Sequence, residues 1–159
     1  MIGAILLIAC TASTSGSDAS NPSFSISDLN STFIKEAYNG SMGEFPDSYK
    51  SLIGDNRIAI RITALNNSVQ SFGLVTKNGQ LEDAVDGELA DPTIELNVKE
   101  NAIIKLQNAE DPAAVFDKAI QDKEISVKGN GFINQLKVNV LLGHPVLPEL
   151  IIQLFAPKK

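Results

Sequence analysis

Alternating apolar and polar residues predict five β-strands, each with one buried face. The clearest run is 57–65, where Ile58, Ile60 and Ile62 alternate with polar or small residues, and a period of two places every second side chain on one side of a strand. The same reasoning predicts strands at 69–76, 80–89, 93–98 and 124–128. Asn66-Asn67 and Asn78-Gly79 suit tight hairpin turns. We therefore expect an antiparallel meander of three strands, which the last two strands extend.

Apolar residues spaced three and four apart predict helices before, between and after the strands. One such stripe predicts an amphipathic helix over residues 25–39, with Ser27-Asp28 as its cap and Gly40 and Gly43 at its end. Asp111-Pro112 opens another helix, because the Asp side chain can cap free amides and proline needs no N–H bond at the first helical position. Further helices are expected after Pro46-Asp47 and over residues 99–107, 132–142 and 146–155.

These elements favour one α+β domain over residues 25–159, since domains commonly contain 100–200 residues. The expected architecture is a single twisted, mainly antiparallel sheet of about five strands, covered on one face by helices. The tail at 146–155 is strongly apolar, and burying each such side chain is worth roughly 1.5–3 kcal/mol. We therefore expect the tail to lie on the core, a lipid, a partner or a membrane rather than in water.

The order strand, short helix, helix, strand within residues 90–131 resembles the sterol carrier protein 2 type of lipid-transfer domain. The matching runs are DPTIELNV, DPAAVFDKAI and KEISVKGNG. The resemblance is strongest over residues 94–142 and extends more weakly back to residue 26. It departs from the family at Gln121-Asp122-Lys123, where the family often has glycine before the last strand. The resemblance implies non-catalytic binding of a sterol, fatty acid or isoprenoid lipid in a tunnel between sheet and helices.

The first 24 residues indicate a membrane-attached lipoprotein outside the cytoplasm. Residues 1–9 suit the apolar centre of a cleaved secretion signal and are too few to span a membrane as a helix. Leu7-Ile8-Ala9-Cys10 resembles a bacterial lipobox, in which Cys10 would be acylated, and residues 10–24 have the composition of a flexible tether. No Lys or Arg precedes the apolar run, which leaves a buried cysteine, an unprocessed leader and a cytoplasmic location as alternatives.

Charge and residue counts argue against several other classes of protein. The net charge of −6, without a basic cluster, argues against a nucleic-acid partner. One cysteine and one histidine provide neither an internal disulfide nor a zinc or iron ligand set. Asp83 and Asp86 fall on opposite faces of a strand, and His144 is expected at the surface in a turn. We therefore predict no catalytic residue, no metal and no cofactor.

Apolar side chains on the inner rows are the remaining candidates for function. They either pack together as a closed core or line a lipid cavity with the 146–155 tail as its lid. An assembly module whose tail docks on another protein is one alternative. An isomerase-like enzyme subunit is another, and it would need Asp83, Arg57 or Arg61 inside the pocket. The predicted ligand-binding residues are Ile60, Ile62, Phe72, Leu74, Leu96, Phe116, Ile120, Leu136, Leu150, Ile151 and Phe155.

Overall fold

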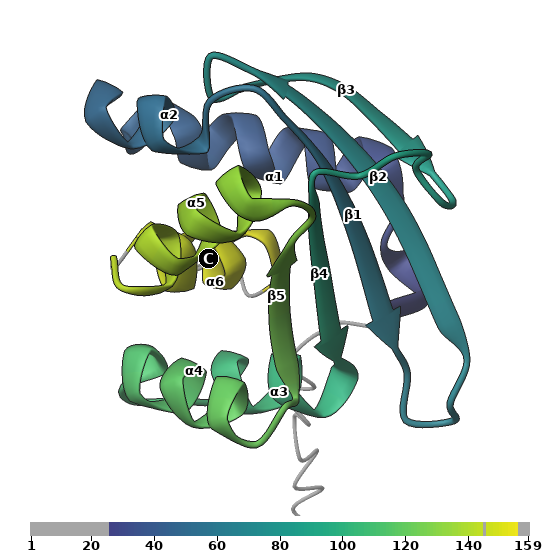
Figure 1. Ribbon diagram of the computed structural model, residues 1–159. Helices are drawn as coiled ribbons and strands as arrows, with labels where there is room; N and C mark the ends of the chain where they lie inside the picture. The colour runs from purple at the N-terminus through teal and green to yellow at the C-terminus, as the bar shows by residue number, and fades with distance from the viewer. Residues whose placement is uncertain (1–25, 145, 156–159) are drawn as a thin grey trace, which may run out of the picture.

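The fold is built on a five-stranded sheet in the order β3-β2-β1-β4-β5, with the helices gathered on one face (Figure 1). The computed structural model describes residues 26–144 and 146–155. Three of the four strand pairs are antiparallel, which confirms the predicted α+β fold with a mainly antiparallel sheet. The strands are β1 (Asn56–Thr63), β2 (Val69–Lys77), β3 (Gln80–Asp86), β4 (Ile94–Lys99) and β5 (Ile125–Gly129).

Strands β1 and β4 pair in parallel, and the meander alone did not predict this pairing. The chain leaves the edge strand β3 and crosses the helix-free face of the sheet to reach the far side of β1. Leu89 in this crossing lies so close to Gly73 of β2 that a Cβ on Gly73 would come within 2.8 Å of the Leu89 Cβ. Arg57 of β1 holds the crossing by donating from Nη2 to the Ala90 carbonyl at 2.8 Å. Glycine in β2 therefore makes room for the connection that sets the strand order.

The helices follow the predicted order, with small shifts at their ends. Asp111 caps α4 as expected, its Oδ1 accepting from the Ala114 amide at 3.2 Å, and Pro112 is the first helical residue. A short 3-10 helix, η1 (Ile26–Asp28), precedes α1 (Ser31–Glu44), α2 (Asp47–Ile53), α3 (Glu100–Gln107), α4 (Pro112–Gln121), α5 (Phe132–Leu142) and α6 (Val146–Phe155).

Helix α1 differs most from its prediction at both ends. It begins after Asn30, whose Oδ1 accepts from the Phe33 amide at 2.8 Å, rather than at Ser27-Asp28. It also continues through Gly40 and Gly43, which were expected to end it. Both glycines face solvent, while Tyr38 and Met42 stay buried on the opposite side. Burial of that apolar face outweighs the roughly 1 kcal/mol that each glycine costs a helix.

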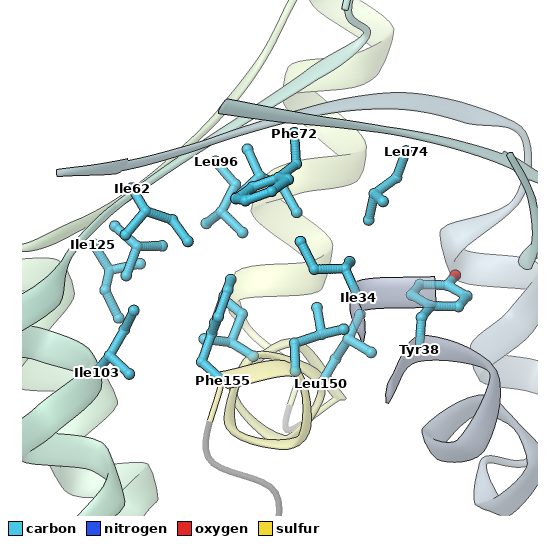
Figure 2. Packing of buried hydrophobic residues seen from close by; sticks show 14 of the residues in the cluster. Ile34, Tyr38, Ile62, Phe72, Leu74, Leu96, Ile103, Ile125, Leu150 and Phe155 are labelled. Carbon is cyan, nitrogen blue, oxygen red and sulfur yellow. The ribbon is translucent and has the colours of Figure 1, made fainter. Parts of the chain in front are cut away.

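The core lies between the inner face of the sheet and the helices (Figure 2). Phe72, Leu74 and Leu96 project from the strands toward Leu150 and Phe155 of α6. The outer face is more polar, and Arg57 and Arg61 are exposed there. The sheet is therefore buried on one face, as the alternating pattern predicts.

The predicted signal (1–9), the lipidation residue Cys10 and the tether (10–24) lie outside the described residues. Within 26–144 and 146–155, no single helix has the length and hydropathy needed to cross a membrane. Helix α5 and residues Leu147–Phe155 reach that length and composition only as a pair bent by 82°.

Candidate functional site

A small apolar cavity of about 50 Å³ lies between the inner face of the sheet and helix α6. Strands β1, β2, β4 and β5 form its roof, and α6 and the end of α5 close it from the other side. The residues that line it are Tyr38, Ile53, Asn56, Ile58, Ile60, Leu74, Ile94, Leu96, Val127, Leu141, Leu147, Leu150, Ile151 and Leu154.

The two polar residues in this lining already have hydrogen-bond partners. The buried Tyr38 hydroxyl donates to the Gly79 carbonyl at 2.9 Å, and burial raises the pKa of Tyr38. The Asn56 amide group donates to the Ile53 carbonyl, and its Oδ1 accepts from the Thr93 hydroxyl at 3.0 Å. Because these bonds occupy the polar groups, the lining offers a guest mainly hydrocarbon contact, which suits an apolar chain.

Helix α6 covers the cavity. Its inward side chains Leu150, Ile151, Leu154 and Phe155 are all buried, and the tail therefore lies on its own core. At the end of the helix, Gln107 of α3 donates from Nε2 to the Phe155 carbonyl at 2.9 Å. The helix begins at Val146, three residues after Gly143, which caps the end of α5. Apolar contact and one side-chain hydrogen bond thus hold a helix that ends the described chain.

Five of the eleven predicted ligand-binding residues line the cavity: Ile60, Leu74, Leu96, Leu150 and Ile151. Four others are buried in the same core cluster beside it: Ile62, Phe72, Phe116 and Phe155. Ile120 is half-buried and packs against that cluster. The inner-row prediction therefore identified the layer in which the cavity lies, whereas periodicity could not separate wall positions from closed core.

Leu136 departs from its predicted place. It was expected to face the sheet, and 56% of its surface is exposed. Helix α5 instead turns Val138 and Leu141 inward. The reason is a close approach at the start of α5, where an added Cβ on Gly129 would lie 2.2 Å from the Asn134 carbonyl carbon. This contact fixes the rotation of α5 about its own axis.

Several lining residues were not among the predicted ligand-binding residues. Ile58, Ile94 and Val127 lie on the inner rows of their strands, so strand alternation could have identified them. Tyr38 lies on the apolar stripe that predicts the helix over 25–39, so its burial was predictable but its place at the cavity was not. Asn56 gave no such signal, because its contribution depends on how α2 and the start of β1 meet.

Charged and titratable residues lie outside this cavity lining, apart from Tyr38. Arg57, Arg61 and Asp83 are exposed, and Arg61 pairs with Glu88 at 3.0 Å. Within the described part of the chain, no group of three His, Cys, Asp or Glu side chains could hold a metal ion. The surface placement predicted for His144 is wrong, since the residue is half-buried with its ring centroid 4.9 Å from that of Tyr49. The turn after α5 folds back onto α2, and this brings the two rings together.

Comparison with solved structures identifies the fold. A crystal structure of sterol carrier protein 2 aligns with a TM-score of 0.51 and 11% identity, over 78% of this chain and 92% of the other. A conserved hypothetical protein of Thermus thermophilus, described as a candidate sterol carrier protein, aligns with a TM-score of 0.51 and 8% identity, over 80% and 86% of the two chains. No family model and no curated protein matches the sequence. The chain therefore has the fold of sterol carrier protein 2.

Proposed function

We propose that this domain binds and carries a hydrophobic ligand, such as a sterol, fatty acid or isoprenoid lipid, without catalysing a reaction. The observation that carries the proposal is the apolar cavity between the sheet and α6, whose two polar lining residues already have hydrogen-bond partners. The fold supports it, because one protein of this fold is named as a sterol carrier. Exclusion of water from the ligand would supply most of the affinity.

The size of the cavity determines how a ligand would enter. About 50 Å³ is far below the roughly 300–1,000 Å³ of typical small-molecule sites. A lipid chain therefore needs part of the core to move, and α6 is the element whose displacement uncovers the inner rows of the sheet. In this mechanism α6 is the lid, and the ligand replaces the contacts of Leu150, Ile151 and Leu154.

Such an exchange is energetically balanced. Each α6 side chain that leaves the core loses roughly 1.5–3 kcal/mol. An acyl chain that takes its place gains about 0.8 kcal/mol for each buried CH₂ group. A chain of ten or more carbons can thus compensate for three or four displaced side chains. This comparison favours a long aliphatic or polycyclic ligand over a short polar one.

Mass spectrometry of an organic extract of the natively purified protein is the primary test. We expect a bound lipid, and we expect the emptied protein to bind a fluorescent fatty acid or sterol. Val127→Phe, which places a ring in the cavity, should weaken that binding. Val85→Phe is the matched control, because Val85 lies on the exposed edge strand β3. Absence of both extracted lipid and probe binding would refute the proposal.

The N-terminal sequence supports a position at a membrane. We include in the proposal that Cys10 is acylated and attaches the domain outside the cytoplasm. The support is the apolar run 1–9 followed by Cys10, with the small residue Ala9 directly before the cysteine. The variant Cys10→Ala should move the protein from the membrane fraction to the soluble fraction. Unchanged fractionation of this variant would exclude the lipoprotein.

The two alternatives have less support. An assembly role would need the tail to dock on another protein, and the packing of Ile151, Leu154 and Phe155 on their own core counts against it. An isomerase-like role would require a polar group free to act in the cavity, and the candidates Arg57, Arg61 and Asp83 are absent from its lining. Lipid carriage therefore remains the proposal.

A further inference from the structure

Helix α5 presents an apolar face to solvent. The exposed fractions are 85% for Phe132, 69% for Ile133, 56% for Leu136 and 49% for Val140. At 100° per residue, positions 132, 133, 136 and 140 fall within about 100° of one another around the helix. These four side chains, which we call the α5 outer face, therefore form one continuous stripe.

The opposite side of α5 is also apolar. Val138 is fully buried and Leu141 is nearly so. The contacts of α5 with β5 and α6 thus use the inner side, and packing among the residues that the structure describes does not account for the outer one. Four large apolar side chains in one stripe approach the few hundred Å² that often mark an interaction site on a monomeric protein.

The charge on α5 itself is basic, although the chain as a whole has a net charge of −6. Lys137 is the charged residue of this helix and lies about 40° from Ile133 around its axis. Lys128 of β5 does not add to this charge, because it alternates with the cavity-lining Val127 and lies opposite Glu95 on the other face of the sheet. The outer face therefore has one lysine at its margin and no carboxylate on its own helix.

We propose that the α5 outer face docks on the surface of a lipid membrane. An apolar stripe flanked by a lysine, here Lys137, is the pattern of a helix that lies in the headgroup region, where the apolar side reaches about 5–10 Å inward and the lysine meets anionic lipids. A second copy of the chain fits less well, because a stable dimer needs roughly 800 Å² from each partner. Four side chains on a convex helix supply about half of that at most.

The docking surface adjoins the cavity but does not depend on it. Leu141, which follows the outer face along α5, is part of the cavity lining, and the turn into α6 comes directly after α5. Docking would place the cavity wall and the start of the lid close to the membrane. The inference concerns where the protein meets lipid, and it holds whether or not the cavity carries a ligand.

A tryptophan placed on the stripe can report membrane insertion, because the natural chain has none. We would compare full-length Phe132→Trp with full-length Leu65→Trp, whose residue is 66% exposed on the β1–β2 hairpin. Both variants keep the same N-terminal segment, so any attachment through that segment is common to them. The probe is a vesicle of phosphatidylcholine and phosphatidylglycerol, with brominated acyl chains as the quencher.

We expect the emission of Phe132→Trp to shift to shorter wavelength and to be quenched by the brominated lipid, whereas that of Leu65→Trp stays unchanged. Adding Leu136→Asn and Val140→Asn should weaken the vesicle affinity reported by the first tryptophan about tenfold. The matched control adds Leu65→Asn and Val69→Asn, and no weakening is expected there. Equal quenching of both reporters, or none at position 132, would overturn the inference. A shift without vesicles that grows with protein concentration would overturn it in favour of a second copy.

Discussion

Truncating Leu154 should lower the stability of the protein but raise its affinity for a ligand. Leu154 is 3% exposed and lines the cavity from α6. Leu154→Ala removes three carbons, worth about 0.8 kcal/mol each, and leaves a larger void. We expect the free energy of unfolding to fall by roughly 3 kcal/mol, near the lower part of the range for such changes, because one side of Leu154 already borders empty space.

The same change should strengthen ligand binding. If α6 must leave the core before a lipid enters, most of the contact energy of Leu154 opposes opening in the natural chain. Removing it raises the open fraction, and the apparent dissociation constant falls by the same factor. About 1.4 kcal/mol of reduced opening cost corresponds to tenfold tighter binding, so we expect a gain of roughly tenfold or more.

Leu81→Ala is the matched control. Leu81 belongs to the core cluster, is 8% exposed and lies on the edge strand β3, outside the cavity lining. It should lose a similar amount of stability with unchanged affinity. Urea denaturation measures the first quantity and titration with a fluorescent fatty acid the second. Equal affinities of the two variants would refute the assignment of α6 as the lid.

Four further substitutions test contacts that stabilise the fold. Tyr38→Phe leaves the buried Gly79 carbonyl without its 2.9 Å donor and should cost about 1–3 kcal/mol in urea denaturation. Gly79→Ala should prevent stable folding at 37 °C, because φ is +74° and the new Cβ would lie 2.2 Å from a backbone oxygen of α2. Gly40→Ala is the contrasting variant, because Gly40 lies in an open part of α1, and it should raise the melting temperature. Hydrogen bonding to Lys105 lowers the pKa of Glu124 in the folded protein. The pair therefore stabilises the fold at pH values above the ordinary glutamate pKa, and this stabilisation is lost as the pH falls through the lowered pKa of Glu124. Lys105→Met should therefore be less stable than the natural chain by under about 1 kcal/mol at pH 7, with the difference vanishing in strong acid; a difference that persists there would mean that lost packing is responsible.

The sequence predicted β1, β2, β4 and β5 well because each has one face in the core, whereas Leu81 is the one buried residue of β3. The inner row of β1, with Ile58, Ile60 and Ile62, pairs with the inner rows of β2 and β4 as alternation requires. Strand order was harder to predict, because it depends on a crossing that runs over Gly73. Glycine occurs in strands for several structural reasons, and only the position of Leu89 above Gly73 shows that this glycine makes room for the crossing.

Apolar periodicity could not predict which side of α5 faces the core, for a different reason. Its apolar residues lie on two sides of the helix, so a stripe through Leu136 and one through Val138 are both available for burial. The backbone contact at Gly129 decides between them. For the cavity, the inner rows were predictable, whereas the places where packing is incomplete depend on side chains from strands and helices that lie far apart in the sequence.

The small size of the cavity has a kinetic consequence. A ligand cannot occupy about 50 Å³ before the lid has moved, so uptake would be limited by the opening rate of α6 whenever ligand is abundant. The observed uptake rate should then reach a plateau as ligand concentration rises, instead of increasing in proportion to it. Release at low ligand concentration would depend on the same motion, and the time a lipid stays bound would be set by the protein more than by the solubility of the lipid.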